Sequence, residues 1–243
     1  MAKRDRKDSI LNAAETLFAL HGYEGTSTRA IADRAGANLA LIAYYFKSKE
    51  GVFQEVVSRR ATALLDRVRV LAEPIDPPWV RLNRFIEETV QFLVAEQPEF
   101  SRILLRESTA PIGHEHTRSP MRASTRPLRE VLMRIQAAGR AEGEFKYADV
   151  DLCLNMLLGV ALMSAADAAS QSPSELSSLS RRAAELVASA FRGLLAKGQP
   201  TAGPLPESPP QPSLPVSTPI DVQTDRETGT LGPDATFQIG EID

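Results

Sequence analysis

The sequence predicts an all-α protein of 243 residues. Apolar residues recur three and four positions apart through most of residues 10–197, which is the period of one helix face. No run of alternating apolar and polar residues typical of a strand occurs there. Prolines and glycines fall between the periodic segments, where helices end. We therefore expect an N-terminal unit of three short helices, a larger helical region and a proline-rich tail.

The first helix is expected to begin in the basic segment AKRDRKD and to end at His21-Gly22, after which Tyr23 returns to the core. Its apolar residues are spaced to give one buried face. They are Ile10, Ala13, Ala14, Leu17 and Phe18.

Residues 28–46, TRAIADRAGANLALIAYYF, predict two short helices joined by a tight turn. Gly36 can take the left-handed conformation that ends a helix. Asn38 can accept a hydrogen bond from the first N–H groups of the next helix, and Thr28 is expected to cap the preceding one. Such a helix-turn-helix, about residues 27–46, presents a helix to the major groove of DNA. Many helical hairpins with this pattern bind no DNA, so the prediction of DNA binding also depends on the neighbouring segments.

The second helix of this pair has two different faces. Leu39, Ile42 and Phe46 are spaced three and four apart, so one face can close a core. The other face combines small residues, which can approach base edges, with a tyrosine and a lysine suited to phosphate. Its members are Ala40, Ala43, Tyr44 and Lys47. Ser48 is expected to cap the following helix, with Lys49 in its first turn.

The continuous stretch ILNAAETLFALHGYEGTSTRAIADRAGANLALIAYYFKSKEGVF, from Ile10 to Phe53, resembles the N-terminal domain of the TetR family of bacterial transcriptional regulators. The resemblance covers about a quarter of the chain and implies roles for single residues. Thr28 and Arg29 would contact phosphate, and Asn38 would cap the recognition helix. Residues facing the bases would be Leu39, Ala40 and Leu41, and those gripping the backbone Tyr44, Tyr45 and Lys49.

The recognition helix departs from the common family pattern at two positions. Ala43 stands where many members carry an aromatic residue, and Ala40 stands where many carry glycine. The variant looks closer to a subgroup with Asn-x-Ala in this turn. An aliphatic face would read thymine methyl groups and DNA shape.

The rest of the chain as far as residue 197 also reads as helix, with Thr109 to Pro120 as a loop. Pro127 is expected to mark the regular start of the helix after this loop. The expected helices run from Glu50 to about Leu71, Trp79 to Glu96, Phe100 to Glu107, Met121 to Arg140, Tyr147 to Ala169 and Pro173 to about Lys197.

The last two expected helices are rich in apolar residues, and Gly159, Ala161 and Ala165 allow another helix to approach closely. Two such helices from each of two subunits would form a four-helix bundle, as TetR-like proteins usually do. We therefore expect a homodimer, although the same residues could be the core of a monomer.

The resemblance further implies a pocket for an unknown small-molecule effector among the middle helices. The alternative is that the apolar candidates form plain core and that the two histidines lie in a solvated loop. Apolar candidates are Phe85, Thr89, Phe92, Phe100, Leu104, Met133 and Met156; polar candidates are Arg106, Glu107, His114 and His116. The His114-x-His116 pair lacks the further ligands of a metal site, so we expect no metal and no cofactor.

Charge and composition narrow the function. Residues 1–60 hold 10 basic and 7 acidic residues, whereas residues 198–243 hold one basic and 7 acidic residues, so the net charge of −3 conceals a basic N-terminal part. No apolar run is long enough to span a membrane, and no secretory segment is recognisable. The single Cys153 excludes an intramolecular disulfide, which is typical of the cytoplasm. No catalytic constellation occurs, so no enzyme activity is expected.

These expectations define three regions: a helix-turn-helix DNA-binding domain at residues 4–64, an effector-binding and dimerisation domain at 65–197, and a disordered, acidic tail at 198–243. The tail holds nine of the 17 prolines, too many for it to bury a core. The predicted function is a dimeric repressor bound to double-stranded operator DNA and released by a small molecule. The alternative is an all-α small-molecule-binding protein or enzyme with a vestigial DNA-binding fold.

Overall fold

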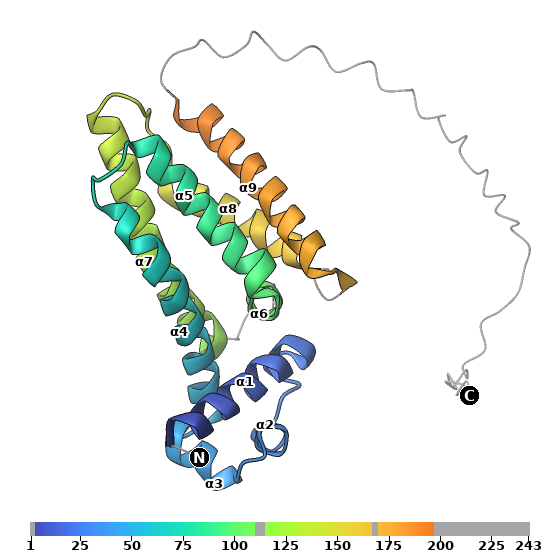
Figure 1. Cartoon of the computed structure of the whole chain (residues 1–243). Helices are drawn as coiled ribbons and strands as arrows, with labels where there is room; N and C mark the ends of the chain where they lie inside the picture. Colours follow the sequence, from blue (N-terminus) through green and yellow to red (C-terminus); the bar gives the residue numbers. More distant parts are fainter. Residues whose placement is uncertain (1–2, 110–114, 167–169, 197–243) are drawn as a thin grey trace, which may run out of the picture. The chain divides into compact units, whose positions relative to one another are not determined.

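The computed structural model describes residues 3–109, 115–166 and 170–196, and these ranges are predominantly helical, as expected (Figure 1). Within them, the single β-type interaction is an isolated bridge between Phe145 and Ala196. The described helices belong to one compact unit, Met1–Gly198. The predicted tail at 198–243 lies outside the described residues.

The N-terminal helices pack around three aromatic rings. Phe18 stacks on Tyr23 with 5.9 Å between ring centroids, and Phe53 meets both rings edge-on at 5.3 and 5.4 Å. The first helix ends where the sequence predicted, because Gly22 takes a φ of 73°. The helices are α1 (Lys3–His21), α2 (Thr28–Ala35), α3 (Leu39–Phe46) and α4 (Lys49–Val68).

The middle of the chain changes helix type twice. After α4 the backbone tightens into the 3-10 turn η1 (Arg69–Ala72). The helix predicted from Trp79 to Glu96 is α5 (Pro78–Gln91) followed by a π-helical turn, η2 (Phe92–Glu96). α6 (Pro98–Ser108) then begins, like α5, with proline at its first position. Proline is tolerated there because the N–H that it lacks has no helical partner.

α7 (Glu115–Ala141) corrects the predicted loop. Residues 115–120 are helical, and Pro120 and Pro127 both lie inside the helix. Each proline removes one intrahelical hydrogen bond, but α7 packs along α4, and burial there outweighs the local loss. The predicted loop residues 110–114 lie outside the described residues.

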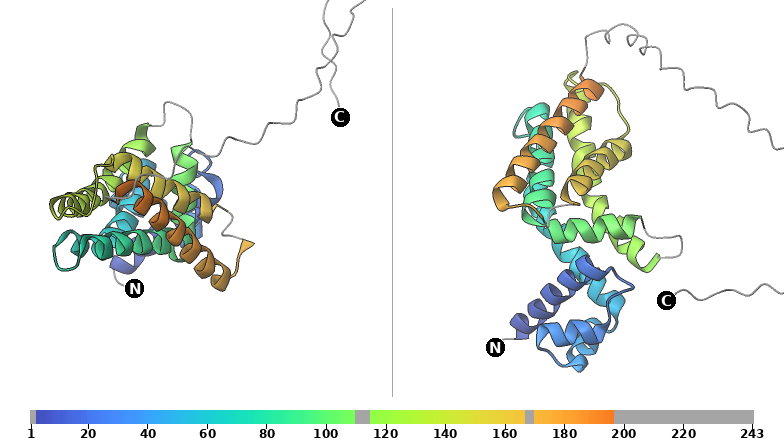
Figure 2. Two further views of the ribbon diagram at one scale, coloured as in Figure 1. Left: turned by 90° about the horizontal axis from the view of Figure 1, so that it is seen from above. Right: turned by 90° about the vertical axis from the view of Figure 1, so that its right-hand side faces the viewer.

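The last two helices, α8 (Val150–Ala165) and α9 (Pro173–Leu195), pack against each other (Figure 2). α8 begins three residues after the predicted Tyr147, because Asp149 Oδ1 accepts from the N–H groups of residues 151 and 152, both at 2.9 Å. α9 begins with a reciprocal capping box between Ser172 and Glu175.

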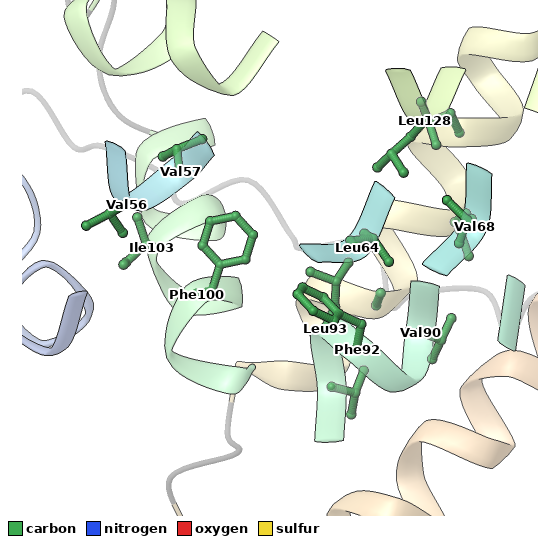
Figure 3. Packing of buried hydrophobic residues seen from close by; sticks show 14 of the residues in the cluster. Val56, Val57, Leu64, Val68, Val90, Phe92, Leu93, Phe100, Ile103 and Leu128 are labelled. Atoms are coloured by element: carbon green, nitrogen blue, oxygen red, sulfur yellow. The ribbon is translucent and has the colours of Figure 1, made fainter. Parts of the chain in front are cut away.

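α4 belongs to both the N-terminal helices and the larger helical region. Its first half carries Val56 and Val57, which lie beside α6 (Figure 3). Its second half carries Leu64 and Val68, which are buried in the core of the larger region with η2 residues such as Leu93. One continuous core therefore runs along α4.

Candidate DNA-binding site

The turn between α2 and α3 is held by short-range hydrogen bonds. Gly36 takes the left-handed conformation at φ 59° and ψ 35°, and the next N–H, that of Ala37, donates to Ala32 O at 2.9 Å. Asn38 Oδ1 accepts from the N–H of Ala40 at 2.9 Å. Both predictions for this turn are confirmed, and the turn fixes the direction in which α3 leaves α2.

The cap of α2 differs from the prediction by one residue. Ser27 has extended backbone angles, and its hydroxyl accepts from the N–H of Ala30 at 3.1 Å. Thr28 is the first residue of the helix and is half-buried. Thr26 is buried and donates to Gly22 O at 2.8 Å. Three consecutive hydroxyl residues thus have three different roles, so the sequence alone pointed to the wrong one.

α3 separates a buried side from an exposed side. Ile42 and Phe46 are buried, as predicted. Leu39 is 48% exposed rather than part of the core, because it is the first helical residue and precedes the turn of α3 that packs inward. Ala40, Ala43 and Tyr44 are also exposed, whereas Leu41 is half-buried against the core. The exposed side is therefore small and mostly aliphatic.

Charged and aromatic side chains border this face. Arg29 is exposed near the start of α2, and Lys47 is exposed at the end of α3. Tyr44 and Tyr45 meet edge-on with 5.1 Å between ring centroids. Lys47 has a φ of 68°, and the N–H of Ser48 donates across it to Phe46 O at 2.8 Å. This tight three-residue turn is strained for a residue with a side chain, and it fixes the position of Lys47 before any ligand arrives.

Lys49 lies in a different environment from Lys47. Its Nζ donates to Tyr23 O at 3.0 Å and lies 4.1 Å from the centroid of the Tyr23 ring. The carboxylate of Glu24 is 4.0 Å away. Lys49 therefore ties α4 to the loop after α1, while Ser48 caps α4 through the N–H of Gly51, as predicted.

The loop after α1 is also held by the end of α6, which the sequence did not indicate. Glu107 is buried, and its Oε1 accepts from the N–H of Tyr23 at 3.0 Å. Arg106 donates to Leu20 O at 3.1 Å. Burial raises the pKa of Tyr23, and the nearby carboxylates of Glu50, Glu24 and Glu107 raise it further. Glu107 and Tyr23, like Arg106 and Leu20, lie more than 80 positions apart, so no local pattern connects either pair.

At the start of α7, His116 meets the same loop. Its ring centroid lies 4.6 Å from that of Tyr23, and its Nε2 lies 3.4 Å from a carboxylate oxygen of Glu24. The other histidine of the predicted pair, His114, lies outside the described residues. The described part of the chain holds no group of three or more potential metal ligands.

The larger helical region contains an apolar cavity of about 260 Å³. Two of the predicted effector residues, Phe100 and Leu104, line this cavity. Its wall comes from α4, η2, α6, α7 and α8. The lining residues are Ala61, Leu64, Leu93, Phe100, Leu104, Ser108, Met121, Ser124, Thr125, Leu128, Asn155, Leu158, Gly159 and Leu162.

The other candidates for the effector pocket lie elsewhere. Phe85, Thr89 and Phe92 are buried and do not line this cavity. Met133 is 40% exposed on α7, and Met156 packs on the core outside the lining. Arg106 is turned toward Leu20, as described above. Residue type alone did not show which side of each helix faces the cavity.

α3 exposes a face of small residues, α2 supports it from behind, and cations lie at its border. This is the architecture of a helix-turn-helix DNA-binding domain. None of the described helices is long and apolar enough to cross a membrane.

Comparisons with known proteins identify the family of this domain. Residues 10–56 match the model of bacterial regulatory proteins of the tetR family. A 56-residue stretch is 46% identical to the probable HTH-type transcriptional regulator YttP of Bacillus subtilis, covering 23% of this chain and 27% of YttP. The HTH-type transcriptional repressor NicS of Pseudomonas putida is 29% identical over 148 residues, covering 61% of this chain and 68% of NicS.

Among solved structures, the transcriptional regulator FadR from Bacillus subtilis, in complex with stearoyl-CoA, shares the fold. Its TM-score is 0.61 at 21% identity, covering 75% of this chain and 97% of FadR. Residues 10–56 of the chain therefore form an N-terminal helix-turn-helix domain of the TetR family.

Proposed function

We propose that the chain is a dimeric repressor that a small molecule releases from its operator. The similar protein NicS is named as a transcriptional repressor, which supports repression rather than activation. We assign residues 4–64 to DNA binding and 65–197 to effector binding and dimerisation, acting in the cytoplasm, with 198–243 as a tail outside both functions.

One observation carries the proposal: α6 connects the cavity to the DNA-binding domain. On one side, Phe100, Leu104 and Ser108 line the cavity. On the other, Arg106 donates to Leu20 O in the last turn of α1, and Glu107 accepts from the N–H of Tyr23 in the loop that follows. A ligand that shifts α6 would therefore move the loop and change the spacing of two recognition helices. A ligand can shift this equilibrium only by its differential affinity for the two states, and a few kcal/mol is enough.

Direct contacts to DNA are assigned to the surface of α2 and α3. We propose that Thr28, Arg29, Tyr44, Tyr45 and Lys47 contact phosphates, with Lys49 positioning the loop beside them. Asn38 fixes the start of α3. The residues that we assign to the bases are Leu39, Ala40 and, at its exposed edge, Leu41.

The proposed base readout is narrow. An exposed aliphatic face offers contacts to thymine methyl groups but few hydrogen bonds to base edges. We assign the chain to a subgroup with Asn-x-Ala in the recognition turn, on the basis of Asn38 and Ala40. Selection of operators from random DNA should return sites whose thymines face α3; strong guanine preferences at its centre would contradict this assignment.

Dimerisation is assigned to the outer faces of α8 and α9. Leu152, Met163 and Leu186 are each more than 60% exposed. An apolar face of this kind on adjacent helices supports a four-helix interface.

Light scattering tests the dimer. The full chain should have the mass of two subunits, and Leu186→Glu should produce monomers. Leu20→Glu, at an exposed leucine on α1, is the matched control and should remain dimeric. A wild-type monomer at micromolar concentration would overturn the assignment.

Gel shifts with the DNA that flanks the gene test operator binding. Lys47→Ala should weaken binding to all sites and reduce the slope of affinity against salt by about one ion per contact. Arg84→Ala removes the same charge from α5, where Arg84 pairs with Asp76, and should leave binding unchanged. If no selected DNA is bound at low salt, the alternative of a small-molecule-binding protein with a vestigial DNA-binding fold is favoured.

A further inference from the structure

The cavity wall has a distinctive composition. Apolar side chains dominate it, and none of the described residues that line it carries a charge. Moving a charged group out of water into such a site is costly unless an opposite charge compensates it. A carboxylate, a phosphate or a coenzyme A ester is therefore a poor fit to this wall.

Four polar side chains line the wall: the amide of Asn155, which can both donate and accept, and three hydroxyls that share one property. Three hydroxyls donate their hydrogen to carbonyls three positions back in their own helix: Ser108 to Leu105 O at 2.8 Å, Ser124 to Met121 O at 2.7 Å and Thr125 to Arg122 O at 3.1 Å. A hydroxyl whose hydrogen is already donated still has lone pairs that accept. The wall therefore offers acceptors to a ligand from both α6 and α7.

In the π-helical part of the wall, the backbone carbonyl of Leu93 already has a hydrogen-bond partner. The π-helical turn η2 brings Leu93 to the cavity, and the carbonyl of Leu93 accepts from Ser101 Oγ at 2.6 Å. The volume of about 260 Å³ lies below the usual range of about 300–1,000 Å³ for small-molecule pockets. The cavity therefore suits a compact ligand.

We propose that the cavity binds a small, neutral, apolar molecule with one hydroxyl group, of the phenol or alcohol class. The apolar body fills the space between Leu64, Leu104 and Leu128, and the ligand hydroxyl donates to a wall hydroxyl. The proposal rests on the effector site of the proposed function and specifies its ligand.

Three probes with the same bicyclic aromatic ring test the proposal: 2-naphthol, naphthalene and 2-naphthoate. Affinity for the full chain is measured by equilibrium titration at pH 7 without DNA. 2-Naphthol should bind about tenfold more tightly than naphthalene, because it adds one hydrogen bond. 2-Naphthoate should bind at least about a hundredfold more weakly than 2-naphthol, because its charge has no partner. Equal affinity for any two of the probes, or no binding of 2-naphthol, overturns the proposal.

Variants locate the hydrogen bond. Either Ser108→Ala or the double change Ser124→Ala with Thr125→Val should lower the affinity for 2-naphthol to that for naphthalene. Ser119→Ala, on α7 but outside the cavity wall, is the matched control and should change neither. Leu104→Trp should fill the space and abolish binding of both probes; helical content by circular dichroism checks its folding. If neither hydroxyl variant changes the ratio of the two affinities, the proposal fails.

The readout separates this proposal from the repressor function. Binding of 2-naphthol without release of operator DNA would leave the ligand class intact and count against the repressor mechanism. If only a charged ligand released the operator DNA, the repressor mechanism would be supported and the proposed ligand class would be contradicted.

Discussion

The α2–α3 unit is stabilised by contacts between residues close in sequence, whereas the apolar cavity is formed by residues far apart in sequence. In the α2–α3 unit, Ser27, Gly36 and Asn38 bond to groups no more than four residues away. The cavity takes its wall from five elements between Ala61 and Leu162. The DNA-reading surface therefore depends on caps and one turn, whereas the ligand site depends on packing. Substitutions in the two regions should differ in size and in kind.

The largest effect is expected in the cavity wall. Leu93→Ala removes a side chain that is 1% exposed, and it should lower the free energy of unfolding by about 2–5 kcal/mol. Urea denaturation measures the loss. Leu20→Ala, at a leucine 50% exposed, should cost less than about 0.5 kcal/mol. Similar costs for the two would mean that Leu93 does not support the wall.

The contact between the regions should come next. Glu107→Ala leaves the buried N–H of Tyr23 without its acceptor, which costs about 1–3 kcal/mol. Glu107→Gln keeps an oxygen at the same position and should recover part of the loss. Thermal unfolding followed by circular dichroism compares the two variants. A glutamine variant no more stable than the alanine variant would show that the carboxylate charge matters more than the hydrogen bond.

Within the α2–α3 unit, the turn should be more sensitive than the cap. Gly36→Ala forces a side chain into a left-handed conformation although nothing lies within 4 Å of it, so about 1–2 kcal/mol of strain is the only cost. Gly193→Ala, inside α9 and equally uncrowded, should instead stabilise by up to about 1 kcal/mol. Opposite signs in urea denaturation are expected, and equal signs would contradict the backbone argument.

The cap of α2 gives a paired test at adjacent hydroxyl residues. Ser27→Ala removes the acceptor for the N–H of Ala30 and should cost about 1 kcal/mol. Thr28→Ala should leave stability nearly unchanged but weaken operator binding. Unfolding and gel-shift measurements on both variants separate folding from DNA contact. The reverse pattern would restore Thr28 as the cap.

The smallest effect concerns Arg67 on α4 and Glu96 in η2. A hydrogen bond from Arg67 holds the pKa of Glu96 below its ordinary value of 4.5. The stability from this pair is therefore complete above about pH 4.5 and is lost as the pH falls through the lower folded-state value. Both side chains are partly exposed, so the contribution is below about 1 kcal/mol.

Arg67→Met should flatten the acid side of the stability profile measured by urea denaturation between about pH 7 and pH 3. In a Glu96→Gln background the same substitution should not change the slope. A slope that persists in both variants would have to arise from other carboxylates.

The same contrast in distance governs what the sequence predicts. Gly36, Asn38 and Ser48 have the expected roles because helix ends depend on a few adjacent residues. The error at Thr28 is one residue, since three neighbouring hydroxyls satisfy the same pattern. The helical start of α7 at Glu115 was missed because the prolines in this segment predict a loop from local sequence. The packing of α7 against α4, which outweighs them, involves residues distant in sequence and leaves no local signal.

The cavity and its link to the DNA-binding domain could be predicted only in part. Phe100 and Leu104 reach the wall. Phe85 and Phe92 are buried outside it, because residue type does not record which side of a helix faces the cavity. The bond between Glu107 and Tyr23 depends on how α6 meets α1, and no spacing along the chain records that contact.

The position of α4 has a practical consequence for making hybrid regulators. The boundary at 64/65 falls inside this helix, between Leu64 and Val68, which are both buried in the larger region. A graft that joins two proteins there would pair half a helix with a foreign core. A junction in the 3-10 turn Arg69–Ala72 keeps α4 whole. It transfers the DNA-binding helices α1–α3 together with the complete α4 helix.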